Sequence, residues 1–319
     1  MPFLPEILES ICSQSFADFE LLVCDNASTD ATEEIVRELA GKDRRVRYVR
    51  FDSDAGASAN FNRCFEGTGG ALFTWAASDD RFCRDYLRSS VDYLSEHPEH
   101  AMCVPDVELI DEAGTVTGLI VQPTALGSSD LAVRLGAYLD RRSWYMVYGL
   151  ARRTALAETG LFPARFGADV ILMWNLLLRR TVGNVGEALL QYRRYAVKTT
   201  DVVWRGIQAT GSRQAPRFLH ARMYRDLLAQ CDQQDLAARR AGRRALAAWL
   251  VSQPFRDLLV DDMCDELRRP DRSSNRLYEA GLLVSVALLR PSRALRNALR
   301  LATEPERGVP PGSHSQLLG

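Results

Sequence analysis

The stretch GASANFNRCFEGTGGALFTWAASDD (residues 56–80) combines a short helical pattern, a glycine-rich exit, an apolar strand and two adjacent carboxylates. Residues 71–78 are apolar and rich in small side chains, as is typical of a buried strand. Asp79 and Asp80 follow directly, although neighbouring carboxylates repel each other. Such a pair can bind a hard cation, accept hydrogen bonds from sugar hydroxyls, or cap the next helix through Asp80.

Strand and helix patterns alternate on both sides of this stretch. FELLVCD (residues 19–25) and VRYVRF (46–51) indicate strands, and between them Asp30 and Glu33 predict a capping box that opens a helix. After the Asp pair, YLRSSVDYLSEHP indicates an amphipathic helix and AMCVPDVELID a fourth strand. This alternation predicts an α/β fold with a parallel, doubly wound sheet, in which ligands bind at the carboxyl ends of the strands. Asp25 and the Asp79–Asp80 pair fall at such ends.

The second half of the chain is less regular. ADVILMWNLLLRR (residues 168–180) predicts a helix, VGEALLQYRRY (185–195) a strand, and the region from residue 214 onward several helices. We expect two halves of one nucleotide-sugar-binding domain, a helical C-terminal extension and a disordered tail. The predicted boundaries are 1–105, 106–205, 206–305 and 306–319.

Composition narrows the range of functions. The 319 residues are 46% hydrophobic and carry a formal net charge of -1, so nothing global favours nucleic acid as a partner. Seven cysteines show no zinc-ligand spacing, which suggests reduced thiols and a cytoplasmic location. Four histidines do not favour a histidine-based metal site or a Ser-His-Asp triad. No signal peptide is evident, and the longest apolar run, residues 280–289, is too short to cross a bilayer.

The order of the motifs resembles the family 2 glycosyltransferases of the GT-A fold. The matching segments are VCDNASTDAT (residues 23–32), the stretch 56–80 and the acid in FGADVILMWNLLLR (166–179). The resemblance covers roughly residues 3–200. It implies a non-processive, inverting transferase that moves a sugar from a nucleotide-diphosphate donor, with a UDP-sugar as first candidate. The implied acceptor is a hydroxyl of a cell-surface glycan precursor or of a secondary metabolite.

The resemblance also implies roles on the donor side. Asp80 would hold Mg²⁺ or Mn²⁺, which neutralises the leaving diphosphate and relieves the repulsion within the Asp pair. Asp79 would contact the ribose or the donor sugar, and Asp25 the base. Asn60 and Arg63 would face the nucleotide. The competing interpretations are a turn-forming Asp25 and a surface Arg63.

On the acceptor side, Asp169 is the implied general base. It precedes an apolar helix whose N-terminus would favour its charge, so a simple helix cap is the alternative. The family usually has Glu-Asp where this chain has Ala168 and Asp169. Trp174 is expected to pack in the core. Arg193 and Arg194 are candidates for contact with the diphosphate, and a solvated strand edge is the alternative for both.

Two departures from the family pattern bear on activity. The chain begins in what should be the first helix, so the opening strand, usually central in the sheet, is missing. Its loss would leave unpaired backbone groups that cost about 1–3 kcal/mol each. This predicts either a natural start upstream or a non-catalytic relative. The smaller departure is Ala77, where many relatives carry a further acid.

The C-terminal segment at residues 277–301 joins a short apolar stretch to an arginine-rich helix pattern. It fits a helix packed on the catalytic domain, or an interfacial helix that brings the protein to the inner face of a membrane. Two rival functions stay open. One is a nucleotidyltransferase, although no basic glycine-rich phosphate loop is visible near the N-terminus. The other is a catalytically silent nucleotide-binding or scaffold protein.

Overall fold

The computed structural model describes residues 2–141, 144–195, 219–250, 252 and 255. The chain divides into two compact units, residues 1–252 and 253–319, and everything below concerns the first. The predicted tail at 306–319 and the arginine-rich segment at 277–301 lie outside the described residues.

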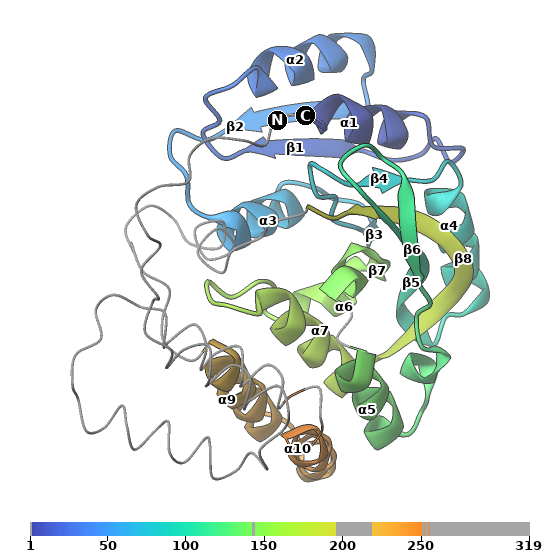
Figure 1. Ribbon diagram of the computed structural model, residues 1–319, viewed down its shortest axis with the longest axis vertical. Helices are drawn as coiled ribbons and strands as arrows, with labels where there is room; N and C mark the ends of the chain where they lie inside the picture. The colour runs from blue at the N-terminus through green and yellow to red at the C-terminus, as the bar shows by residue number, and fades with distance from the viewer. Residues whose placement is uncertain (1, 142–143, 196–218, 251, 253–254, 256–319) are drawn as a thin grey trace, which may run out of the picture. The chain divides into compact units, whose positions relative to one another are not determined.

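The N-terminal part forms a small two-stranded sheet. Strand β1 (Leu21–Asp25) and strand β2 (Val46–Arg50) run parallel and are joined through helix α2 (Thr32–Lys42). Helix α1 (Leu4–Cys12) buries Leu4, Ile7, Leu8 and Ile11, which recur at the spacing of one helical face. The same apolar cluster includes Val36 and Val46, so α1, α2 and the sheet share one core (Figure 1).

The second sheet is larger and mixed. Its strand order is β3-β7-β5-β8-β4, with β6 paired to β5. Only β5 and β8 run parallel, and the other pairs are antiparallel. The α/β class is confirmed, but the prediction of a parallel sheet is wrong, because a tight hairpin returns the chain as β6 and because β7 pairs antiparallel with β5. The strands are β3 (Leu72–Phe73), β4 (Arg81–Phe82), β5 (His100–Ile110), β6 (Val116–Ile120), β7 (Leu150–Arg152) and β8 (Thr181–Arg193).

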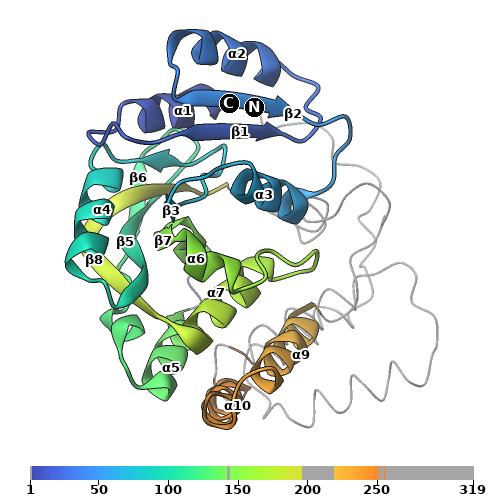
Figure 2. The same ribbon diagram turned by 180° about the vertical axis from the view of Figure 1, so that it is seen from behind.

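Helix α7 lies at the centre of the second half of the unit. It buries ten of its residues, Trp174 among them with no exposed surface, so the expectation that Trp174 packs in the core is confirmed. Helix α10 packs on α5 and α7, and α9 packs on α7 and α10, as Figure 2 shows from behind. The helices of this half are α3 (Ala57–Glu66), α4 (Tyr86–Glu96), α5 (Leu131–Arg141), α6 (Arg153–Ala157), α7 (Ala168–Arg179), α9 (Leu219–Asp232) and α10 (Leu236–Leu250), with 3₁₀ turns η1 (Thr124–Gly127) and η2 (Trp144–Tyr148).

Two local predictions need correction. Strand β3 spans two residues instead of the expected eight, since beyond Phe73 the segment has no strand partner among the described residues. The capping box is also absent: Ala31 is the N-cap of α2 and makes no side-chain bond. Asp30 instead accepts hydrogen bonds from the backbone N–H and the hydroxyl of Thr32, so it stabilises the turn before the helix.

Gly149, between η2 and β7, provides a test of the packing. A Cβ there would lie 2.4 Å from the carbonyl oxygen of Cys103 and 2.8 Å from side-chain atoms of Met102 and Val104. We therefore expect Gly149→Ala to lower the free energy of unfolding by about 1–3 kcal/mol, measured by urea denaturation.

Gly136 is the matched control, because a Cβ at this position in α5 would meet nothing within 4 Å. Gly136→Ala should raise stability by up to about 1 kcal/mol, since alanine favours helix more than glycine does. Equal destabilisation by both substitutions would contradict the described approach of η2 to β5.

Candidate active site

A cavity of about 1050 Å³ separates the two sheets. One wall is the free edge of β1, and the opposite wall is the segment from residue 70 to Asp79. No described strand lies between them. Much of the lining is apolar, with Ile7 and Leu8 from α1, but the carboxyl end of β1 adds polar groups. The cavity therefore lies between the edge of β1 that faces away from β2 and the segment that ends at Asp79.

The free edge of β1 follows from its register with β2. The Leu21 N–H donates to the Arg45 carbonyl, and the Asp25 carbonyl accepts from Phe51. Since alternate residues of a parallel strand bond to the same neighbour, the peptide groups of Leu22 and Cys24 point to the cavity side. Asn60 is fixed there, because its amide donates to the Cys24 carbonyl over 2.9 Å. Its buried Oδ1 has no hydrogen-bond partner in the described part of the chain.

Asp25 lines the polar end of the cavity but is held by the protein itself. Its carboxylate accepts hydrogen bonds from the Ser28 N–H over 2.8 Å and the Tyr48 hydroxyl over 2.5 Å, and it pairs with Arg50 at 2.9 Å. Burial acts to raise the pKa of Asp25, but these hydrogen bonds and the arginine charge outweigh it, so the pKa lies below its ordinary value. Asp25 is therefore an ionised carboxylate that orders the loop after β1.

Arg63 lies beside the same loop. Its guanidinium donates to the Asn26 side chain over 3.2 Å and covers the ring of Phe51 at 3.8 Å. Arg63 does not line the cavity, whereas Asp25, Asn60 and Asp79 do. The structure thus brings three of the predicted donor-side residues to one cavity, and Arg63 lies outside its lining.

The two members of the Asp pair have different surroundings. Asp79 lines the cavity, and its carboxylate accepts a hydrogen bond from the Tyr195 hydroxyl over 2.8 Å. Asp80 is only 1% exposed, and its Oδ1 accepts a hydrogen bond from the backbone N–H of Arg193 over 2.9 Å. Asp80 is therefore anchored to the end of β8, and Asp79 is turned toward the open space.

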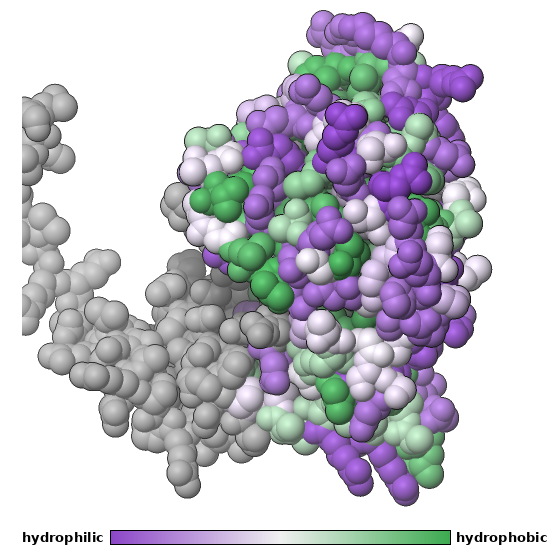
Figure 3. Space-filling model, turned by 90° about the vertical axis from the view of Figure 1, so that its right-hand side faces the viewer, coloured by the Kyte–Doolittle hydropathy of each residue, from purple (hydrophilic) through white to green (hydrophobic). Residues whose placement is uncertain are grey.

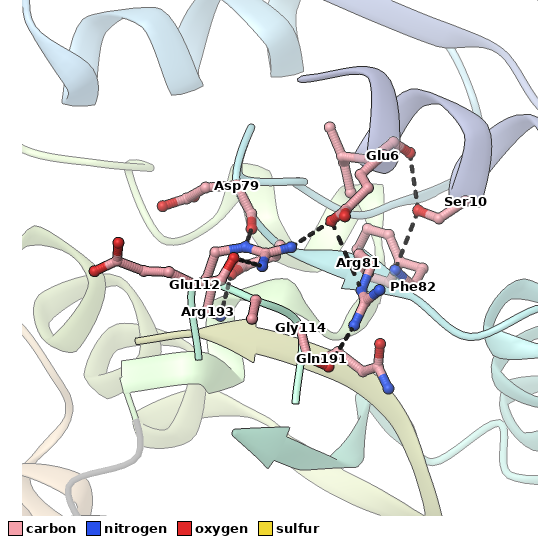
Figure 4. A network of polar contacts seen from close by, with 12 residues as sticks. Glu6, Ser10, Asp79, Arg81, Phe82, Glu112, Gly114, Gln191 and Arg193 are labelled. Atoms are coloured by element: carbon pink, nitrogen blue, oxygen red, sulfur yellow. Dashed lines mark hydrogen bonds and ion pairs between the residues drawn. The ribbon is translucent and has the colours of Figure 1, made fainter. Parts of the chain in front are cut away.

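Arg193 is the anchor of this region (Figure 4). Its Nε donates to the Asp79 carbonyl over 2.8 Å, and Nη1 donates to the carbonyls of Asp111 and Glu112. Nη2 pairs with the Glu6 carboxylate of α1. With 1% of its surface exposed, Arg193 binds protein groups, and this geometry does not support contact with a diphosphate. Arg194 is exposed, so of the two candidate arginines it is the one that a ligand can reach.

Asp169 stands in the first turn of α7, two residues after the N-cap Gly167. Burial raises the pKa of its carboxyl to about 6, although hydrogen bonds from the backbone N–H groups of Asp169 and Val170 oppose the shift. A carboxylate with a pKa near neutrality suits the removal of a proton from a hydroxyl.

Asp79, Asp80 and Asp169 share one neighbourhood. After burial, all three carboxylates contribute to the raised pKa of Tyr148, and all three also act on Tyr192. Because such effects fall off with distance, the Asp pair and Asp169 lie close to the same two phenols. The sequence analysis gave no role to either tyrosine. The run QYRRY (residues 191–195) was a signal for Tyr192, whereas no motif marks Tyr148.

In the described ranges, no helix is both long enough and apolar enough to cross a bilayer. The face drawn in Figure 3 mixes hydrophilic and hydrophobic residues.

The N-terminal region is similar to known proteins. Residues 1–120 match the model of glycosyl transferase family 2. A putative glycosyltransferase of Bacillus subtilis, EpsE, is 30% identical over 184 residues, which are 54% of this chain and 65% of EpsE. The putative teichuronic acid biosynthesis glycosyltransferase TuaG of the same organism is 26% identical over 94 residues, 30% of this chain and 37% of TuaG. The chain thus spans less than two thirds of the length of these relatives.

Solved structures resemble the fold. S. aureus TarS, residues 1–349 in complex with UDP-GlcNAc, superposes with a TM-score of 0.58 at 15% identity, covering 84% of this chain and 77% of that one. At this identity the likeness shows the fold alone, and it agrees with the two-sheet α/β architecture and the helical C-terminal region. Residues 1–120 of this chain are thus similar to glycosyl transferase family 2, and most of the chain shares its fold with the solved structure of TarS.

Proposed function

We propose that this chain is a non-processive, inverting glycosyltransferase that moves a sugar from a nucleotide-diphosphate donor to a hydroxyl group. The supporting observation is that Asp79, Asp80 and Asp169 all act to raise the pKa values of Tyr148 and Tyr192, while Asp79 also lines a cavity with a polar end. Inverting transfer needs a group that favours departure of the diphosphate and a base on the acceptor side. The Asp pair and Asp169 are carboxylates suited to these two tasks.

On the donor side, the polar end of the cavity would take the nucleotide. Asn60 presents its buried Oδ1 there, and Asp79 meets the ribose or donor sugar. The loop ordered by Asp25 and Arg63 shapes the site for the base. TarS was solved with UDP-GlcNAc, which supports a UDP-sugar as the first donor to test.

The Asp pair fits a hard divalent ion, because adjacent carboxylates supply the oxygen ligands that Mg²⁺ and Mn²⁺ prefer. We assign the ion to Asp80, with Asp79 beside it. When bound, the ion would neutralise charge that grows on the leaving diphosphate. Arg193 keeps Asp80 in place through its backbone N–H, and it fixes the Asp79 main chain through Nε.

On the acceptor side, Asp169 accepts the proton of the attacking hydroxyl. Its raised pKa strengthens it as a base relative to an exposed aspartate, while it remains mostly ionised above pH 7. Arg194 is exposed near the end of β8 and is our candidate for contact with the diphosphate.

The acceptor is a hydroxyl of a glycan precursor or of a small metabolite. The names of the relatives favour a glycan, since one is assigned to teichuronic acid biosynthesis and another, from Myxococcus xanthus, to O-antigen biosynthesis. We place the reaction in the cytoplasm, in keeping with the six described cysteines, which are all free thiols. Peripheral membrane contact through residues 277–301 stays part of the proposal.

A catalytically silent nucleotide-binding protein is the second candidate. It is favoured by the engagement of Asp25 with Ser28, Tyr48 and Arg50, which leaves little of this carboxylate for a ligand. Turnover of a donor separates the two candidates.

The Asp pair can be tested by thermal unfolding with UDP, GDP and dTDP, each with and without Mn²⁺. We expect one nucleotide to raise Tm only when Mn²⁺ is present, because ligand at about 100 times its Kd adds about 2.7 kcal/mol of stability. Asp80→Asn should abolish this dependence on Mn²⁺. Asparagine is chosen over alanine because its Oδ1 can still accept the hydrogen bond from Arg193.

Asp92→Asn is the matched control, since Asp92 is exposed on α4 and should leave the response unchanged. Loss of the Mn²⁺ response in Asp79→Asn but not in Asp80→Asn would show that Asp79, and not Asp80, holds the ion. A folded wild-type chain that responds to none of the nucleotides would rule out the proposed donor site.

Asp169→Asn should reduce release of the nucleoside diphosphate from its donor at least about 100-fold, mainly in kcat, because the base is lost. The free energy of unfolding of this variant should rise while its activity falls. The pKa of Asp169 is 3.8 unperturbed and about 6 in the folded chain, so its stabilising contribution is complete below pH 3.8 and is lost as pH rises through 6. At pH 7.5 the variant should therefore be more stable than the wild type by about 2 kcal/mol.

This stability difference should shrink as the pH falls from 7 to 4, which denaturation at several pH values would measure. Asp140→Asn, at an exposed position of α5, is the matched control and should change neither activity nor the pH profile. An Asp169→Asn variant with wild-type turnover would exclude Asp169 as the base, whatever its stability.

A further inference from the structure

The turn between α4 and β5 brings together three side chains that the proposed reaction does not use. The ring of His97, the carboxylate of Glu99 and the ring of His100 offer one ligand atom each, all within 4.8 Å of one another. His97 Nδ1 lies 3.2 Å from Glu99 Oε1, and His100 Nε2 lies 3.6 Å from the same oxygen. At zinc–ligand bonds of 2.0–2.2 Å and tetrahedral angles, ligand atoms stand about 3.4 Å apart.

Hydrogen bonds define the tautomer of His100. The Thr181 hydroxyl donates its one hydrogen to the Glu99 carbonyl over 3.0 Å, since a carbonyl can only accept. Thr181 Oγ1 therefore accepts at its 3.0 Å contact with His100 Nδ1, and this nitrogen carries the proton. In the neutral imidazole, Nε2 then holds a lone pair 3.6 Å from a carboxylate oxygen. A cation between these two electron-rich atoms would relieve the repulsion between them.

The frame around these side chains is well fixed. His97 packs on Tyr93 with ring centroids 4.4 Å apart, and its backbone N–H donates to the Tyr93 carbonyl. The His100 N–H donates to the His97 carbonyl over 3.2 Å, which closes the turn. A Cβ at Gly127 would lie 3.5 Å from His100 Nε2, so glycine keeps space beside this nitrogen. The bond from His100 Nδ1 to Thr181 resembles the outer-shell contacts that orient metal-binding histidines.

We propose that His97, Glu99 and His100 form a binding site for Zn²⁺ or a similar transition-metal ion. The ligands would be His97 Nδ1, the Glu99 carboxylate and His100 Nε2, with a fourth position open to water or another molecule. Two imidazoles and one carboxylate suit Zn²⁺, whereas Mg²⁺ and Ca²⁺ prefer oxygen ligands alone.

This site is separate from the candidate active site. His100 and Thr181 are the first residues of β5 and β8, which run parallel, whereas Asp80 bonds to Arg193 at the far end of β8. Bound metal would fix the α4–β5 turn, which is already hydrogen-bonded to the start of β8 through His100 and Thr181. The expectation that four histidines do not favour a metal site thus overlooked that two of them flank one turn.

The test is titration of the full chain with Zn²⁺ under reducing conditions, followed by calorimetry and by thermal unfolding. We expect one equivalent of Zn²⁺ to bind and to raise Tm, with no comparable effect of Mg²⁺. His97→Gln and Glu99→Gln should each weaken binding at least tenfold. Both positions are on the surface turn, so these variants should keep the fold and the Tm of the metal-free chain.

Glu96→Gln is the matched control, because Glu96 is exposed on the last turn of α4 and is outside the cluster. It should bind Zn²⁺ as the wild type does. Co²⁺ in place of Zn²⁺ gives a second readout, since nitrogen and oxygen ligands lack the intense thiolate-to-metal absorption of a cysteine site.

Absence of stoichiometric Zn²⁺ binding by the folded wild-type chain would overturn the proposal. Unchanged binding in His97→Gln and Glu99→Gln would overturn it equally, as would a thiolate absorption band with Co²⁺. Tenfold weaker binding in both variants, with normal binding in Glu96→Gln, would establish the site.

Discussion

The buried guanidinium of Arg193 holds the candidate active site together. It binds three separate parts of the chain: Glu6 of α1, the main chain of Asp79 and the β5–β6 turn. The backbone N–H of the same residue donates to the Asp80 carboxylate. An arginine with so little exposure must have its donors satisfied, because unpaired buried charge is very costly. The position of the Asp pair is therefore a consequence of satisfying one cation inside the protein.

Each of the two sheets contributes residues to the proposed chemistry. The small sheet ends at Asp25, which is neutralised by its own neighbours and orders the following loop. The larger sheet contributes the end of β8, beside which the Asp pair and Asp169 act on the same phenols. Between the sheets lies the cavity, apolar along α1 and polar at the carboxyl end of β1. Of the acids assigned to the reaction, Asp79 lines this cavity, whereas Asp80 and Asp169 lie outside its lining.

Much of the fold and part of the site could be predicted from the sequence. The features that were missed have no clear local sequence pattern. Apolar runs followed by Asp25, Asp79 or a helix with Asp169 were sufficient to place these acids at element ends. The role of Arg193 was not predictable, since its partner Glu6 is 187 residues away in the chain. The antiparallel entry of β7 was also missed, because three residues carry too little pattern to give a direction. The His97 cluster depends on a turn geometry that composition does not record.

The open edge of β1 has a consequence for how the molecule fluctuates. The unit β1–α2–β2 is built from contacts close in sequence, and among the described strands β1 pairs with β2 alone. Among the described strands, its ladder hydrogen bonds are separate from those of the larger sheet, while the side chains of both sheets share one apolar core. The β1 edge can therefore fray without breaking the ladder of the larger sheet. The peptide hydrogens of Leu22 and Cys24 would then exchange with solvent far sooner than those of the β5–β8 ladder. The nucleotide end of the site therefore belongs to the less cooperative part of the protein, and its order would increase when a ligand bridges the two walls.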